Sequence, residues 1–175
     1  MQRRLAWALV TALAAWDQAA DPAKPLTLEL RVFNGTDEVT ADTRATIHRA
    51  GDRGEPLLLA SPTGAVPAKR RFDAAVEVRV APGIYDVQAI HEREGRVLNI
   101  RWANRLVVMD YPDEAGHHLE VINFRNGFGA LQIRSAGGGQ PDVALYEPGK
   151  RDQPTAAPFT RSAYLLFVVR AGSYD

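Results

Sequence analysis

Cysteine is absent from this chain of 175 residues, and neither sign of charge is in excess. Without cysteine there are no disulfides, no thiolate nucleophile and no cysteine-ligated metal site. Lysine plus arginine number 21, as do aspartate plus glutamate, so the formal net charge is +0. Because binding to nucleic acid requires basic residues that neutralise phosphates, we expect no nucleic acid partner. The fold must be stabilised by packing of its apolar residues, which form 46% of the sequence.

Long apolar runs are also scarce, and the longest lies at the amino terminus. The run LAWALVTALAAW follows Arg3 and Arg4, and Ala12 and Ala14 have the small side chains that a signal peptidase requires. This order predicts a cleaved signal peptide over residues 1–14 and a proline-containing linker over residues 15–25. The run is shorter than the roughly 20 residues that span a bilayer, and it has no polar face to make it an amphipathic surface helix. We therefore expect an exported protein, periplasmic or extracellular, without a stable membrane span.

Residues from Leu26 onward show the pattern of strands rather than helices. In LTLELRVF, apolar residues such as Leu28 and Leu30 alternate with polar residues such as Glu29 and Arg31. This period of two is typical of a half-buried strand, and AAVEVRVA repeats it. Glycine and proline separate such runs, for example in FNGTDE and SPTG. The sequence predicts an all-β fold, an antiparallel β-sandwich in which two sheets bury their apolar faces against each other.

A short motif occurs twice in the chain. PGIYD at 82–86 matches AGSYD at 171–175, and an apolar run precedes each copy. Upstream, LELRVFNG is echoed by GALQIRSAGGG, and ADTRATIHRAG by QPDVALYEPGK. Self-similarity of this kind indicates tandem domains. We predict one β-sandwich domain over residues 26–126 and a second, truncated copy over residues 127–175.

The same motif carries a resemblance to a known family. The order of a strand, PGIYDV and a second strand resembles the transthyretin-like, immunoglobulin-like β-sandwich modules called carboxypeptidase regulatory-like domains. It is also similar to repeats attached to some bacterial von Willebrand A-type proteins, in which segments like RWANRLVV and HHLEVINFRNGFGALQIR follow the tyrosine strand. The resemblance implies a non-catalytic accessory or spacer module of an exported protein. It implies the fold more directly than the function, because one fold serves many functions.

Pro82, Gly83 and Tyr85 are the predicted structural residues of the motif. Proline fixes φ at the first central position of a turn and glycine accepts positive φ at the second, so APGI fits a type II turn. Tyr85 would bury its ring and needs a hydrogen-bond partner for its hydroxyl. We therefore expect this tyrosine to fix the corner between two strands rather than to act in catalysis.

Candidate metal and catalytic residues lack the context that such sites require. His117 and His118 are adjacent, and neighbouring strand residues point to opposite faces, so the two cannot chelate one ion from a regular strand. Asp110, Asp113 and Glu114 lack the alternating spacing of a calcium loop. The glycines of SAGGGQP precede a proline and a strand, unlike those of a phosphate-binding loop, and no Gly-x-Ser-x-Gly motif is present. We expect no enzyme activity, no cofactor and no metal.

The strongest binding candidate is the segment EREGRVLNIRWANR. It places Trp102 among Arg96, Arg101 and Arg105, and such a ring among guanidinium groups could dock an acidic polysaccharide or a protein. Alternation favours a different interpretation, in which Trp102 and the apolar residues two and four positions before it share a core face and the arginines are solvated.

Three hypotheses of different classes remain open at this point, and the last of them is a hydrolase or metal-dependent enzyme that requires His117 and His118. The first, which we expect, is a non-catalytic exported structural or protein-interaction module whose partner is a protein or a neighbouring domain. The alternative is a carbohydrate- or peptidoglycan-binding module that uses Trp102 and the neighbouring arginines to hold a polysaccharide.

Overall fold

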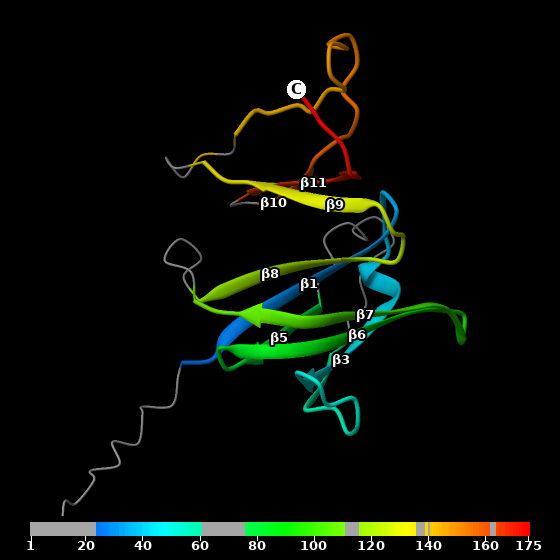
Figure 1. The fold of residues 1–175 in the computed structure, drawn as a ribbon, viewed down its shortest axis with the longest axis vertical. Helices are drawn as coiled ribbons and strands as arrows, with labels where there is room; N and C mark the ends of the chain where they lie inside the picture. The colour runs from blue at the N-terminus through cyan, green and yellow to red at the C-terminus, as the bar shows by residue number, and fades with distance from the viewer. Residues whose placement is uncertain (1–23, 61–75, 111–115, 136–138, 140, 162–163) are drawn as a thin grey trace, which may run out of the picture.

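The computed structural model describes residues 24–60, 76–110, 116–135, 139, 141–161 and 164–175 of the chain. As predicted, these residues form an all-β fold built mainly from antiparallel strands, and the helix found among them is a short 3-10 turn at Thr40–Asp42. The predicted signal peptide at 1–14 lies outside the described residues, as does most of the linker at 15–25. The strands form three sheets, here named A, B and C (Figure 1).

Sheets A and B pack face to face as a β-sandwich. The strands of sheet A are β1 (Leu26–Asn34), β2 (Asp37–Glu38), β5 (Val76–Val80) and β8 (His117–Asn123), and those of sheet B are β3 (Thr43–Arg49), β4 (Leu58–Ala60), β6 (Gly83–Arg93) and β7 (Arg96–Val108). β1 is central in sheet A: it pairs antiparallel with β5 and β2, and parallel with β8. Sheet B is antiparallel throughout, in the order β4, β3, β6, β7.

The core between these two sheets follows from the alternating pattern of the sequence. Every second residue of β1 points into it and meets the alternate residues of β3 and β6 from sheet B. The buried members include Leu26, Leu28, Leu30, Val32, Ala45, Ile47, Val87 and Ala89. Each large aliphatic side chain removed from water contributes roughly 1.5–3 kcal/mol, so packing of this kind can stabilise a chain that has no disulfides.

Sheet C covers the other face of sheet A. It contains β9 (Phe128–Ile133), β10 (Phe159–Arg161) and β11 (Tyr164–Arg170), with β11 in the middle. Tyr164, Leu166 and Val168 of β11 pack against Phe33 of β1, and the intervening Leu165 and Phe167 form a separate cluster on the far side of β11. The molecule therefore has three layers, with sheet A between sheets B and C (Figure 1).

This third layer buries the polar face of β1. Glu29 and Arg31 are only 3% and 1% exposed, whereas a half-buried strand would leave them in water. Arg31 compensates by a two-pronged ion pair: its Nε and Nη2 donate to the carboxylate of Glu38 at 2.9 Å and 2.7 Å. Burial alone would lower the pKa of Arg31, but Glu38 raises it above its ordinary value, so the guanidinium stays charged.

The tyrosine motif makes the same contact in both places where it occurs. The hydroxyl of Tyr85 donates to the carbonyl of Ala81 at 2.7 Å, and the hydroxyl of Tyr174 donates to the carbonyl of Arg170 at 2.6 Å. Each tyrosine is thus tied to the residue four positions earlier, Tyr85 from the start of β6 and Tyr174 from the segment after β11.

The aspartates that follow the two tyrosines also accept corresponding hydrogen bonds. Asp86 accepts a hydrogen bond from the backbone N–H of Gly51, and Asp175 accepts one from Gly149, both at 3.0 Å. In both places the strand before the tyrosine pairs antiparallel with a strand from the start of the same segment, β5 with β1 and β11 with β9. The sequence match between 82–86 and 171–175 is therefore accompanied by matching hydrogen bonds.

The turn before Tyr85 differs from the predicted one. Gly83 is the first residue of β6 and its φ lies outside the left-handed region, so APGI does not form a type II turn; Pro82 lies in a bend just before the strand. A Cβ at position 83 would lie 3.3 Å from the hydroxyl oxygen of Tyr85. Close approach of the tyrosine ring, rather than backbone conformation, is the reason for glycine here.

Candidate functional site

Strand β7 carries all four residues that were predicted to bind a partner. It is the last strand of sheet B: it pairs with β6, and no strand within the described ranges pairs with its other edge. The pairing shifts register between Tyr85 and Val87 and again between His91 and Glu92. Edge strands present unpaired backbone groups to which another chain can bind, and β7 is one of the two edge strands of sheet B among the described residues.

The ring of Trp102 lies on the outer face of sheet B, away from the core. The next residue, Ala103, packs against the core, and successive strand residues point to opposite faces. The ring contacts His48 with centroids 5.1 Å apart, and the guanidinium of Arg53 lies 4.7 Å from its centroid. Thr46 holds His48 in place through a contact of 2.9 Å between its hydroxyl and Nε2. Trp102 is half-buried among these polar side chains, so the prediction of a core tryptophan is wrong.

Apolar side chains on both sides of Trp102 in β7 are exposed. Leu98 and Ile100 are 52% and 56% exposed, and Val97 and Val107 are exposed to a similar degree. The prediction that Leu98 and Ile100 face the core is therefore also wrong. A period of two shows which residues share a face of the strand, but not which face the neighbouring sheet covers. We refer to Val97, Leu98, Ile100, Trp102 and Val107 together as the β7 surface.

The structure does not gather the predicted arginines around Trp102. Arg101 points to the opposite side of β7 and donates to the side-chain oxygen of Asn126 at 3.1 Å. Arg96 is exposed in the hairpin between β6 and β7, opposite Arg93, and Arg105 is exposed at a bulge. The arginine that contacts the ring is Arg53, which the sequence could not reveal because it lies in the loop after β3, far from Trp102 in the chain.

Arg105 has a structural role that involves Asp86. Its backbone lies in the left-handed region at φ 55, and its N–H donates to Asp86 Oδ1 at 2.7 Å. This hydrogen bond, together with the one from Gly51, holds the pKa of Asp86 below its usual value. The charged carboxylate therefore fixes the bulge that separates Trp102 from the end of β7.

Glu120 lies in the wall of two clefts between β8 and β9, one of which β7 also lines. Burial raises the pKa of this carboxyl to about 7. A carboxyl that titrates near neutrality can serve as an acid or base, but catalysis also needs a nucleophile or a second titrating group nearby. Among the residues that line the cleft of about 240 Å³ beside β7, Arg101 is the other charged side chain. Glu120 is the one carboxyl among the residues that line this cleft.

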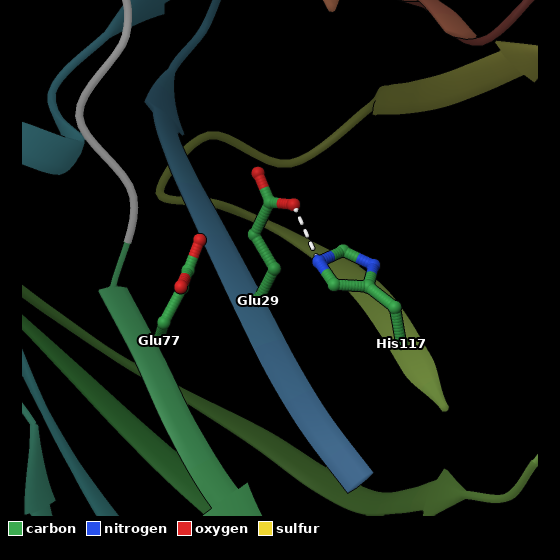
Figure 2. A group of neighbouring side chains, drawn as sticks. All are labelled: Glu29, Glu77 and His117. Atoms are coloured by element: carbon green, nitrogen blue, oxygen red, sulfur yellow. Dashed lines mark ion pairs between the residues drawn. The ribbon is translucent and has the colours of Figure 1, made fainter. Parts of the chain in front are cut away.

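A second group of polar residues lies on the face of sheet A that is turned toward sheet C. Glu29, Glu77 and His117 come from the adjacent strands β1, β5 and β8 and point toward one another (Figure 2). His117 Nε2 is 3.0 Å from Glu29 Oε2. His118 is buried on the opposite face of β8, so the two histidines do point apart as the alternation of strand residues requires. The sequence could not predict this group, because it depends on how β1 pairs with two distant strands.

The predicted acidic turn is described only in part. Asp110 accepts a hydrogen bond from the backbone N–H of Gly116 at 3.1 Å, which is a turn-closing contact. Asp113 and Glu114 lie outside the described residues.

Comparison of the chain with protein-family models, with curated proteins and with solved structures gave no match. In the part of the chain that the structure describes, no helix has the length and apolar character needed to cross a membrane.

Proposed function

We propose that the chain is a non-catalytic, exported β-sandwich module that binds a protein partner or a neighbouring domain through the β7 surface. We assign the fold to the class of transthyretin-like and immunoglobulin-like sandwiches. The partner binds at the edge of sheet B. The observation that carries the proposal is the exposure of Leu98 and Ile100, at 52% and 56%, on a strand that forms the edge of its sheet.

The physical case rests on the cost of leaving apolar groups in water. Exposed apolar residues that gather on one element mark sites of interaction, and β7 presents four of them around a half-buried tryptophan. An edge strand adds backbone donors and acceptors, so a partner can gain both apolar burial and ladder hydrogen bonds. The ring of Trp102, fixed by His48 and Arg53, supplies a rigid centre for such an interface.

The alternative of a carbohydrate-binding module is less well supported by the geometry. A sugar stacks on an open aromatic face, but the guanidinium of Arg53 lies over the ring of Trp102 at 4.7 Å. Arg101 points away from that ring, Arg96 is the first residue of β7, and Arg105 lies at the bulge that follows Trp102. A polysaccharide would therefore have to displace Arg53, and among the described residues it would find no cluster of arginines around the ring.

Export is proposed from the amino-terminal sequence alone. The arginine pair, the apolar run and the small residues before position 15 form the pattern of a signal peptide.

Site-specific photo-crosslinking in the organism that produces the chain tests this proposal. A photoreactive amino acid at position 100 should yield one discrete cross-linked product with a single partner. The same group at position 152, an exposed residue of the loop before β10, should yield none. The exchange Leu98→Asp should abolish the product at position 100 without unfolding the chain, because Leu98 is half exposed.

The opposite results would refute the role of the β7 surface. One is the absence of a product at position 100, and another is equal products at positions 100 and 152. A third is a product that persists in Leu98→Asp when circular dichroism shows the fold to be intact. Retention of the chain on peptidoglycan that is lost in Trp102→Ala would instead support the carbohydrate-binding alternative.

A further inference from the structure

Glu29, Glu77 and His117 meet because three neighbouring strands align them on one face of sheet A. Glu29 of β1 is the direct antiparallel partner of Glu77 in β5. On the other side of β1, the parallel register pairs Thr27 with His117, which places the imidazole diagonally next to Glu29. The ligand atoms of the three side chains all lie within 4.8 Å of one another (Figure 2).

Two of the three side chains in this group are carboxylates, and they face each other across β1 and β5. Two carboxylates directly opposite each other in a ladder destabilise the pair, and the Glu29 side chain is only 4% exposed, so water screens it poorly. Among the described residues, Glu77 forms no ion pair or hydrogen bond. Arg79, the neighbouring cation of β5, instead donates to the hydroxyl of Thr27 at 3.2 Å.

We propose that Glu29, Glu77 and His117 form a binding site for a divalent transition-metal ion, with Zn²⁺ as the preferred ion. One imidazole nitrogen and two carboxylate oxygens are ligands of the kind that zinc accepts, with a fourth position left for water. Calcium and magnesium prefer oxygen ligands throughout and take more of them. A divalent ion neutralises both carboxylates and leaves the neutral imidazole as a ligand.

The arrangement of the side chains suits this role. Two ligands of one tetrahedral zinc lie about 3.4 Å apart, as metal–ligand distances of about 2.1 Å require, so one side chain must move by roughly an ångström. Glu77 can do so, because it is exposed and β5 lies at the side of sheet A. The hydroxyl of Tyr164 donates to Glu29 Oε1 at 3.3 Å, and the other oxygen, Oε2, is directed at His117. Such outer hydrogen bonds orient the ligands of metal sites.

Competition with a chromophoric chelator tests the proposal, with the full chain freed of metal and Zn²⁺ as the only added ligand. The unmodified chain should bind one Zn²⁺. Glu77→Gln and His117→Gln should each lower the affinity for Zn²⁺ at least tenfold. Glu55→Gln, which alters an exposed glutamate in a loop outside the site, is the matched control and should bind as the unmodified chain does. Glu77 and His117 are chosen because they are more exposed than Glu29, whose replacement could prevent folding.

A thermal melt gives a readout that does not depend on measuring affinity. Zn²⁺ should raise the melting temperature of the unmodified chain, because a ligand that binds the folded state stabilises it, but not that of Glu77→Gln. Without metal, Glu77→Gln should melt at a higher temperature than the unmodified chain, since it removes the repulsion with Glu29. Zinc binding that is equal in Glu77→Gln, His117→Gln and the unmodified chain would overturn the proposal, and so would the absence of bound zinc.

Discussion

At the scale of single residues, Glu120 makes the stability of the fold depend on pH. Burial raises its pKa from 4.5 to about 7, so the folded chain binds this proton more tightly than the unfolded chain does. The contribution of this bound proton to the free energy of unfolding is fully present below about pH 4.5. It falls as the pH rises and is lost above about pH 7. The full effect is at most about 3 kcal/mol.

The exchange Glu120→Gln should remove this dependence. Urea unfolding at pH 5, 6, 7 and 8 should show the free energy of unfolding of the unmodified chain declining relative to that of Glu120→Gln, with the largest difference at pH 8. Arg101, which lines the same cleft, can reduce the difference by stabilising the ionised carboxylate. Parallel pH profiles for the two proteins would show that Glu120 titrates as an exposed glutamate.

The single residues that sequence reasoning placed well are those whose role follows from local chemistry. Tyr85 needs a hydroxyl partner and finds it four residues earlier, at Ala81. Trp102 could not be placed in this way, because its surroundings come from His48 and Arg53, which lie in another part of the chain. A tryptophan between alternating apolar residues suits a core and an exposed face equally well until the neighbouring sheet is known.

At the scale of elements, β1 shows what a period of two can and cannot predict. The alternation of Leu28, Glu29, Leu30 and Arg31 gave the correct strand and the correct division of its faces. It also suggested that the polar face is solvated, whereas sheet C buries Glu29 and Arg31. That burial depends on β9 and β11, about which the sequence of β1 holds no information.

The buried ion pair of β1 leads to a prediction about this element. Arg31 and Glu38 have side chains that are 1% and 0% exposed and lie 2.7 Å apart. Removing one partner leaves an uncompensated buried charge, which typically costs about 3–5 kcal/mol, while replacing both can be nearly neutral. Chemical denaturation of Arg31→Met, Glu38→Met and the double variant should therefore show two strongly destabilised single variants and a double variant that loses much less than their sum. Additive losses would mean that the pair does not act as a unit.

The candidate sites depend on pairings between elements that no local pattern specifies. The sequence pointed to the segment around Trp102, and the β7 surface does lie there. It missed the group of Glu29, Glu77 and His117, because these residues become neighbours only when β1 pairs antiparallel with β5 and parallel with β8. The parallel pair is the less expected one in a sandwich of mainly antiparallel strands.

At the scale of the whole molecule, sheet A packs against sheet B on one face and against sheet C on the other. Its leucine face forms the core with sheet B, and its other face holds Phe33 against Leu166 and Val168 of sheet C. Because β1 takes part in both interfaces, loss of sheet C would expose Arg31 and Phe33, which are now almost completely buried. The three layers should therefore unfold together rather than one after another.

This cooperativity can be tested with Leu166→Ala. Leu166 is 1% exposed, and removing a buried leucine side chain typically costs about 2–5 kcal/mol. Native-state hydrogen exchange should show the amides of β11 and of β1 losing protection by the same amount, because both become exposed in the same unfolding event. Leu131→Ala, at a position of β9 that is 43% exposed, should change neither strand. If β11 lost protection while β1 kept it, sheet C would open on its own, and the buried face of β1 would have to be stable without its cover.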